Sequence, residues 1–192
     1  MLEVVKHPAE VLRAKAERIQ EVDEEIAELA QEMLDTMEAA DGIGLAAPQV
    51  NRRLRMFVCH VKDDERRVFI NPEIIGTSME TVTYEEGCLS VPGVYADIER
   101  SASIEVQARN ERGRRFRLDA SGLLARVILH ETDHLNGVLF TDRVEEETLA
   151  WLVPDEDAEE GYRWVATTIE EAQKRFQKMI ESRKERSDSS QQ

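Results

Sequence analysis

The chain has 192 residues with a formal net charge of −15, and 41% of its residues are hydrophobic. This length suits one domain with a sizeable core, and the acidic balance argues against direct DNA binding, which usually needs a basic surface. No apolar run is long enough to span a membrane and the first residues lack a signal-peptide pattern, so we expect a cytoplasmic protein with no membrane contact.

The first half of the chain combines one clear helix with extended segments. Residues 23–40 carry apolar side chains at helical spacing behind Asp23, a good N-cap residue, and therefore predict a helix. Residues 53–61 and 66–71 have the pattern of two strands in a hairpin, and residues 74–84 that of further extended chain.

The second half predicts two more strands and a C-terminal helix. The strands lie around 104–108 and 114–118, and Pro92-Gly93 has the composition of a turn. Residues 151–164 suggest a surface loop that joins two helices. We expect residues 1–166 to form a single catalytic domain and residues 167–192 a C-terminal helix with a disordered end, from 187 to 192.

A short motif with metal-binding chemistry lies at His130-Glu131-Thr132-Asp133-His134. Positions i and i+4 of a helix point the same way, so both imidazoles can reach one metal ion, with Glu131 beside them as a candidate proton carrier. Ser121 suits the N-cap of this helix, and Gly137 its C-terminal stop. The alternative is a polar pair on a structural helix, because a catalytic centre needs a third protein ligand.

Cys88 is a candidate for that third ligand. Gly87 leaves one flank of the thiol uncovered, and both zinc and iron(II) accept a thiolate together with two imidazoles. Cys88 could equally be an ordinary small hydrophobic residue, which is the default for Cys59 in its predicted strand. Two cysteines do not suggest a disulfide framework.

Three stretches together, in this order and spacing, closely resemble the signature motifs of the peptide deformylase family: Gly42–Gln49, Glu86–Ser90 and His130–His134. That family removes the formyl group from the N-terminal formylmethionine of new bacterial and organellar proteins. The resemblance extends from about residue 3 to residue 145. It implies an α+β fold, with antiparallel or mixed sheets around a central metal-binding helix.

The resemblance also implies a role for each matching residue. Cys88, His130 and His134 would bind one divalent ion, with iron(II) as the first choice and zinc, nickel or cobalt as alternatives. Glu131 would be the general base and acid. The oxyanion of the reaction would be held by Gln49 and the backbone N–H of Leu89.

The remaining candidate residues would contact the substrate. The backbone of Gly42, Ile43, Gly44 and Leu45 would pair with the peptide as an added strand. Ile43, Val127 and Ile128 would line a pocket for the methionine side chain, although each could instead be plain core. Glu86 lies beside the cysteine and could pair with Arg100 to brace this loop; the alternative is two independent surface charges.

Three features depart from the family pattern or lie beyond it. Leu129 stands where the family usually has glutamine, which leaves the ligands intact but can remove a supporting hydrogen bond. The segment 151–164 is unusual for the family. From Lys174 to Arg186 the chain carries six basic and two acidic residues, which suggests either a ribosome contact or a helix that packs on the body.

Two other functions remain compatible with the residues. A metallopeptidase of the H-E-x-x-H type would take its third ligand from downstream of the helix, where acidic candidates but no histidine follow His134. A binding protein could keep the metal site without turnover, although metal binding alone needs neither Glu131 nor Gln49. Contact between Cys88 and the metal would separate the deformylase from the metallopeptidase.

Overall fold

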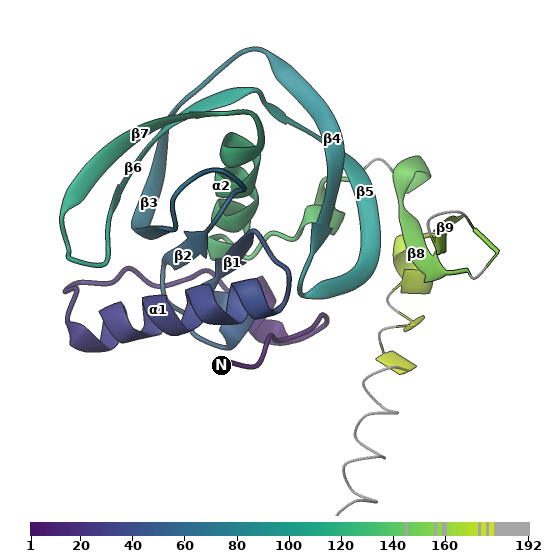
Figure 1. Cartoon of the computed structure of the whole chain (residues 1–192), viewed down its shortest axis with the longest axis horizontal. Helices are drawn as coiled ribbons and strands as arrows, with labels where there is room; N and C mark the ends of the chain where they lie inside the picture. The colour runs from purple at the N-terminus through teal and green to yellow at the C-terminus, as the bar shows by residue number, and fades with distance from the viewer. Residues whose placement is uncertain (145, 156, 159–160, 173, 176, 179–192) are drawn as a thin grey trace, which may run out of the picture.

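The computed structural model describes residues 1–144, 146–155, 157–158, 161–172, 174–175 and 177–178. These residues form two antiparallel sheets, and helix α2 (Gly122–Leu135) lies between them (Figure 1). The first sheet has the spatial order β1 (Gly44–Ala46), β2 (Met56–Cys59), β3 (Arg67–Thr77), β6 (Ser103–Arg109) and β7 (Arg115–Ser121). The second has the order β4 (Thr81–Cys88), β5 (Val91–Ser101), β8 (Ala150–Pro154) and β9 (Tyr162–Ala166). The expected α+β architecture around a central helix is confirmed.

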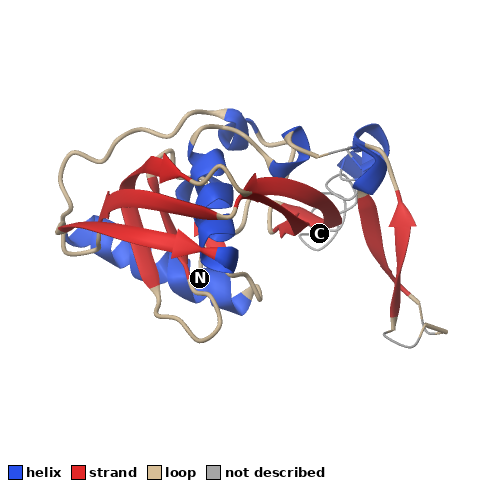
Figure 2. Ribbon diagram, turned by 90° about the horizontal axis from the view of Figure 1, so that it is seen from above, coloured by secondary structure: helices blue, strands red, loops and turns tan. Residues whose placement is uncertain are grey.

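Helix α1 (Glu24–Ala39) matches the helix predicted over 23–40. The Asp23 carboxylate accepts a hydrogen bond from the backbone N–H of Ile26, at 3.0 Å, and so caps the first turn as expected. The apolar side chains of α1 pack against the outer side of the first sheet, so the helix covers a face of that sheet (Figure 2).

Strand β2 is buried on both faces because it lies between the two long helices. Successive side chains of a strand point to opposite faces. Met56 and Val58 therefore join the core cluster beneath α1, whereas Phe57 and Cys59 join the cluster beneath α2. This explains why β2 is a continuous apolar run with no alternation of polar residues.

The extended segment predicted at 74–84 is divided between the two sheets. Strand β3 ends at Thr77 in the first sheet, and β4 begins at Thr81 in the second, after a turn at residues 78–80 (Figure 1). The chain thus crosses from one side of α2 to the other. This crossing brings Cys88, at the end of β4, toward the helix that carries the two histidines.

Two expectations about turns and loops are wrong. Pro92-Gly93 does not turn the chain: the β4–β5 turn is at residues 89–90, and Pro92-Gly93 lies in a bulge of β5, where Gly93 has a φ of +77°. Residues 151–164 do not join two helices but contain most of β8 and most of β9, a hairpin that adds to the second sheet. Their aromatic and β-branched residues favour strands, and the acidic run between them forms the loop.

The rest of the described chain is short helical turns and the start of a C-terminal helix. The 3-10 turns are Glu10–Arg13, Ala47–Val50, Phe140–Asp142 and Glu146–Thr148. Residues 169–172, 174–175 and 177–178 are helical, as predicted, whereas the expected disordered end at 187–192 and most of the basic segment lie outside the described residues. Among the helices that the structure describes, none has the length and apolar character needed to cross a membrane.

Candidate active site

Helix α2 presents both histidines on one side, as the i, i+4 spacing predicts. It begins at Gly122, directly after Ser121, which occupies the N-cap position although its hydroxyl makes no capping bond. Gly137, with a φ of +75°, follows the end of the helix. A Cβ at this position would lie 2.4 Å from the carbonyl oxygen of Arg13, so only glycine lets the N-terminal segment pass so close.

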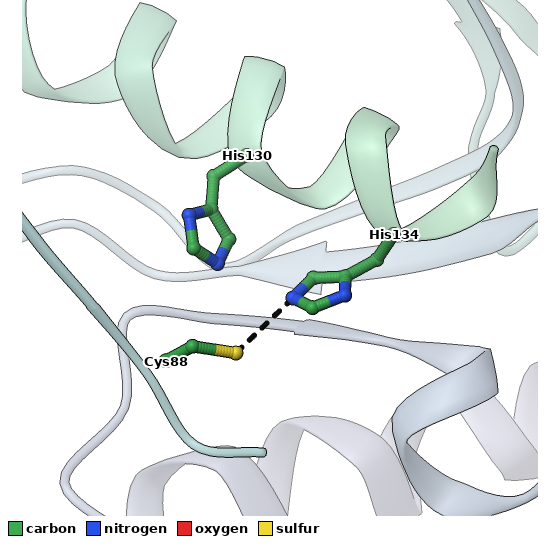
Figure 3. Close-up of side chains that lie close together, drawn as sticks. All are labelled: Cys88, His130 and His134. Carbon is green, nitrogen blue, oxygen red and sulfur yellow. Dashed lines mark hydrogen bonds between the residues drawn. The ribbon is translucent and has the colours of Figure 1, made fainter. Parts of the chain in front are cut away.

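Cys88, His130 and His134 converge on one point between the helix and the turn after β4 (Figure 3). Their ligand atoms all lie within 4.8 Å of one another, and Cys88 Sγ is 3.2 Å from His134 Nε2. Ligands around a tetrahedral zinc-type ion are roughly 3.5 Å apart, given metal–ligand bonds of 2.0–2.3 Å. One thiolate and two imidazoles at this separation fit a single divalent ion with a position left for water.

The surroundings of the two histidines shift their pKa values in opposite directions. Burial lowers the pKa of His134 well below its ordinary value, so its imidazole is neutral and able to coordinate a metal. Burial also opposes charge on His130, but hydrogen bonds to Cys88 and Glu86 raise its pKa to about 10. Cys88, which favours a proton on His130, would favour a bound cation in the same place, whereas Glu86 contacts the other ring nitrogen, Nδ1.

Glu131 lies beside this triad with one oxygen unused. Its carboxylate is buried, and burial raises its pKa to about 7. Among the residues that the structure describes, Oε2 has no hydrogen-bond partner, which is unusual for a buried polar atom and suits contact with a water molecule. Gly44 makes room for the other oxygen, because a Cβ there would be 2.3 Å from Glu131 Oε1.

A buried network of charged side chains supports His130. Glu86 Oε2 lies 2.9 Å from His130 Nδ1, and Glu86 also accepts hydrogen bonds from Arg100 Nε (2.6 Å), Arg100 Nη2 (2.9 Å) and Arg126 Nη1 (2.7 Å). Burial alone would raise the pKa of Glu86, but the bonds from Arg100 and His130 outweigh it and lower the pKa to about 2. A carboxylate on Nδ1 leaves Nε2 of His130 for the metal.

The network continues to the surface through Asp133. Arg100 Nη1 donates to Asp133 Oδ2 at 2.8 Å, and Arg143 donates to both oxygens of Asp133, each at 2.6 Å. The Glu86–Arg100 pair is therefore one part of a larger structure, with both side chains only 5% exposed. The alternative of two independent surface charges does not hold.

Gln49 is fixed with its amino group toward the cysteine. The backbone N–H of Ala46 donates to Gln49 Oε1 at 2.7 Å, which sets the orientation of the amide. Gln49 Nε2 then lies 3.5 Å from Cys88 Sγ and donates to Ser90 Oγ at 3.2 Å. The N-terminal segment holds the same loop, since Lys6 Nζ donates to the carbonyl of Leu89 at 2.7 Å.

A cavity of about 570 Å³ opens beside the triad. Of the expected substrate contacts, those that line it are Gly42, Ile43, Gly44, Glu86, Leu89 and Val127. Leu45 and Ile128 do not line it: both are fully buried, Leu45 in the cluster beneath α1 and Ile128 in the cluster beneath α2. Successive helix residues are about 100° apart, so Val127 faces the cavity while Ile128 faces the first sheet.

Comparison with known proteins assigns the family. The family model described as polypeptide deformylase matches residues 1–150. The chain belongs to that family. A peptide deformylase from Synechococcus sp. (strain RCC307) is 54% identical over 140 residues, which cover 71% of this chain and 70% of that protein.

Solved structures of peptide deformylases have the same fold as this chain. The peptide deformylase from Synechococcus elongatus is 49% identical, with a TM-score of 0.73 over 75% of this chain and 79% of that one. The one from Thermotoga maritima is 42% identical, with a TM-score of 0.74 over 76% and 98%. As a peptide deformylase, the chain is a metal-dependent hydrolase that removes the N-terminal formyl group from nascent formylmethionyl polypeptides and releases formate.

Sequence reasoning missed several residues of the site. Arg126 and Asp133 complete the charged network, and Ser90 accepts from Gln49. Arg126 carried a usable signal, because an arginine inside an apolar helical stretch usually has a buried acidic partner. Leu129, the departure from the family pattern, is half-buried and packs against the cluster beneath α2, so an apolar contact replaces any hydrogen bond there.

Proposed function

We propose that Cys88, His130 and His134 hold the catalytic ion and that Glu131 moves the proton in deformylation. The observation that carries this proposal is the unpaired, buried Oε2 of Glu131 next to three converging ligand atoms. The donor set suits iron(II) and also zinc, nickel or cobalt; we propose iron(II) as the native ion, one per chain. Such an ion would lower the pKa of a bound water molecule from its bulk value toward neutrality.

Glu131 is the general base and then the general acid. Its pKa of about 7 lets it accept a proton from the attacking water near neutral pH and release it again. Amide hydrolysis needs that proton on the departing nitrogen, because an unprotonated amine anion is a poor leaving group. One carboxylate in the cavity lining, with an oxygen that no described residue bonds, can perform both transfers in turn.

Gln49 and the backbone N–H of Leu89 stabilise the oxyanion. The tetrahedral intermediate of amide hydrolysis carries negative charge on the former carbonyl oxygen, and donors held in place before the reaction stabilise it most. The bond from Ala46 to Gln49 Oε1 supports this role, since it keeps Nε2 on the side of Cys88. Loss of such a donor typically costs about 3–4 kcal/mol in the barrier.

The substrate backbone adds to strand β1. This strand is the end of the first sheet, so its outer edge is available for another strand, and residues 42–44 line the cavity there. Ile43 and Val127 then contact the methionine side chain. Glu86 supports His130 from the side opposite the metal. Because the side chain of Leu45 is buried, Leu45 contributes only its backbone to the strand pairing. Ile128 is also buried and contributes only to packing.

Formate release from a formyl-Met-Ala peptide tests these roles. We expect turnover by protein purified without oxygen at one ion per chain, and no cleavage of internal peptide bonds. Glu131→Gln should keep the ion and lose at least about 100-fold in kcat, in line with general acid–base catalysis. Cys88→Ala should lose the ion. A Glu131→Gln variant with full activity, or cleavage of unformylated peptides, would contradict the proposal.

We further propose that residues 1–166 form the catalytic domain and that the basic segment after residue 174 contacts the ribosome in the cytoplasm, where nascent chains emerge. Ile169 and Ala172 pack with the core of the second sheet, which places the start of the helix on the body of the protein. The net charge of −15 argues against DNA as a partner. Cosedimentation with ribosomes that persists after deletion of residues 174–192 would contradict this contact.

A further inference from the structure

The hairpin β8–β9 lies against a wall of the catalytic cavity. Strand β5 supplies this wall with Pro92, Gly93, Val94 and Tyr95. Strand β8 pairs with β5 at the same place, since Val94 is opposite Trp151 and Tyr95 is opposite Ala150 (Figure 1). The hairpin lies almost wholly beyond residues 1–150, the part that matches the family model.

Tyr95 places an aromatic ring next to the metal ligand Cys88. Gly87, directly before Cys88, pairs with Tyr95 across the sheet. A Cβ on Gly87 would lie 2.6 Å from Tyr95 Cε1, so the ring lies over the glycine in the space that a side chain would fill. Because Tyr95 also lines the cavity, the glycine exposes an aromatic surface to the substrate.

Trp164 of β9 holds this ring in place. The two rings meet edge to face, with centroids 5.4 Å apart and planes at 89°. Trp164 is still 47% exposed, so the pair leaves apolar surface open to solvent next to the cavity wall. Trp151 secures the hairpin from the other strand: it contacts Gly93, and the Arg175 guanidinium lies 4.4 Å from its ring centroid.

We propose that Tyr95, positioned by Trp164, forms a subsite for an apolar or aromatic side chain of the peptide downstream of the formylmethionine. The inference rests on the proposed function, which places the formyl group at the triad and the methionine against Val127 in the inner cavity. The chain then leaves toward solvent in an extended conformation, with about 3.3 Å between residues. The half-buried ring of Tyr95 lines the cavity and the exposed ring of Trp164 adjoins it, so both rings are accessible to such a chain.

Peptide kinetics can test the subsite. The substrates are formyl-Met-Ala-Ala-Ala and three relatives in which phenylalanine replaces one alanine at a time. We expect phenylalanine at one of these positions to lower KM two- to tenfold in the wild type, as expected for one aromatic pair, with little change in kcat. The measured quantity is the ratio of kcat/KM for the phenylalanine peptide to that for the all-alanine peptide.

The variants separate binding from folding. Trp164→Ala and Tyr95→Ala should bring this ratio close to one, whereas Trp164→Phe should retain it. Tyr162→Ala is the matched control, because Tyr162 is an exposed aromatic residue two positions away on the same strand, and it should leave the ratio unchanged.

Three results would overturn the subsite: no preference for phenylalanine at any position, a preference that survives Tyr95→Ala, or equal losses on all peptides in Trp164→Ala. Deformylation of the all-alanine peptide tests the proposed catalytic roles separately, so the failure of one proposal is distinguishable from the failure of the other.

Discussion

Replacement of Arg100 by alanine tests the buried network that supports the metal site. Arg100 donates two hydrogen bonds to Glu86 and one to Asp133, and its side chain is 5% exposed. Removing one partner of a buried ion pair typically costs 3–5 kcal/mol, because the other charge stays buried. In the variant, Glu86 still has Arg126 and His130 as partners, and Asp133 still has Arg143. We therefore expect a loss in the free energy of unfolding at the lower end of this range, about 3 kcal/mol.

The loss in the free energy of unfolding can be measured by urea unfolding of the wild type and of Arg100→Ala at equal metal content. For a protein of this length 1 kcal/mol corresponds to roughly 2–4 °C, so the melting temperature should fall by about 6–12 °C. Metal affinity should fall about 10- to 100-fold, because Glu86 would orient His130 less firmly. Arg66→Ala is the control: Arg66 forms an exposed pair with Glu38 and should cost less than about 1 kcal/mol.

An Arg100→Ala variant that stayed within about 1 kcal/mol of the wild type and also kept its metal affinity would contradict both roles of the network. That result would mean that the remaining partners of Glu86 are sufficient by themselves. A stability loss with unchanged metal affinity would limit the network to a folding role and separate it from the orientation of His130.

Three further changes have defined outcomes. Gly44→Ala should fold and bind metal but lose most of its kcat, because the new Cβ would be 2.3 Å from Glu131 Oε1 and would displace the base; normal steady-state kinetics would contradict this. Gln49→Ala should lower kcat about 10²- to 10³-fold with little change in KM, as measured by formate release, and a pure KM effect would remove Gln49 from the oxyanion site. A thiol reagent at pH 8 should modify only Cys88 in the metal-free protein and neither cysteine in the metal-loaded protein, since Cys59 is fully buried with a pKa raised to about 12; two reactive native thiols would contradict the packing of β2.

Local patterns in the sequence predicted what depends on local structure. The spacing of apolar residues and the Asp23 cap defined α1, and the i, i+4 histidines defined one side of α2. The predictions that were wrong concern positions that depend on long-range packing. Ile128 and Val127 are equally apolar neighbours, and only the position of the sheet decides which one reaches the cavity.

The charged network was only partly foreseeable for the same reason. Arg100 is 14 residues from Glu86 and 33 from Asp133, so the pattern of charges alone cannot show that all three meet in the interior. The hairpin over residues 151–164 was missed because its acidic loop dominates the composition of that segment. Its strands are recognisable mainly by their pairing, β8 with β5 and β9 with β8.

The crossing of the chain between β3 and β4 has a consequence for the stability of the whole molecule. Cys88 comes from the second sheet, whereas the two histidines come from the helix that is packed on the first. An ion bound by all three would be a cross-link between two halves that are otherwise joined by the chain itself and by noncovalent contacts. Part of its binding free energy would therefore contribute to holding the halves together, and we expect a chelator to lower the melting temperature as well as the activity.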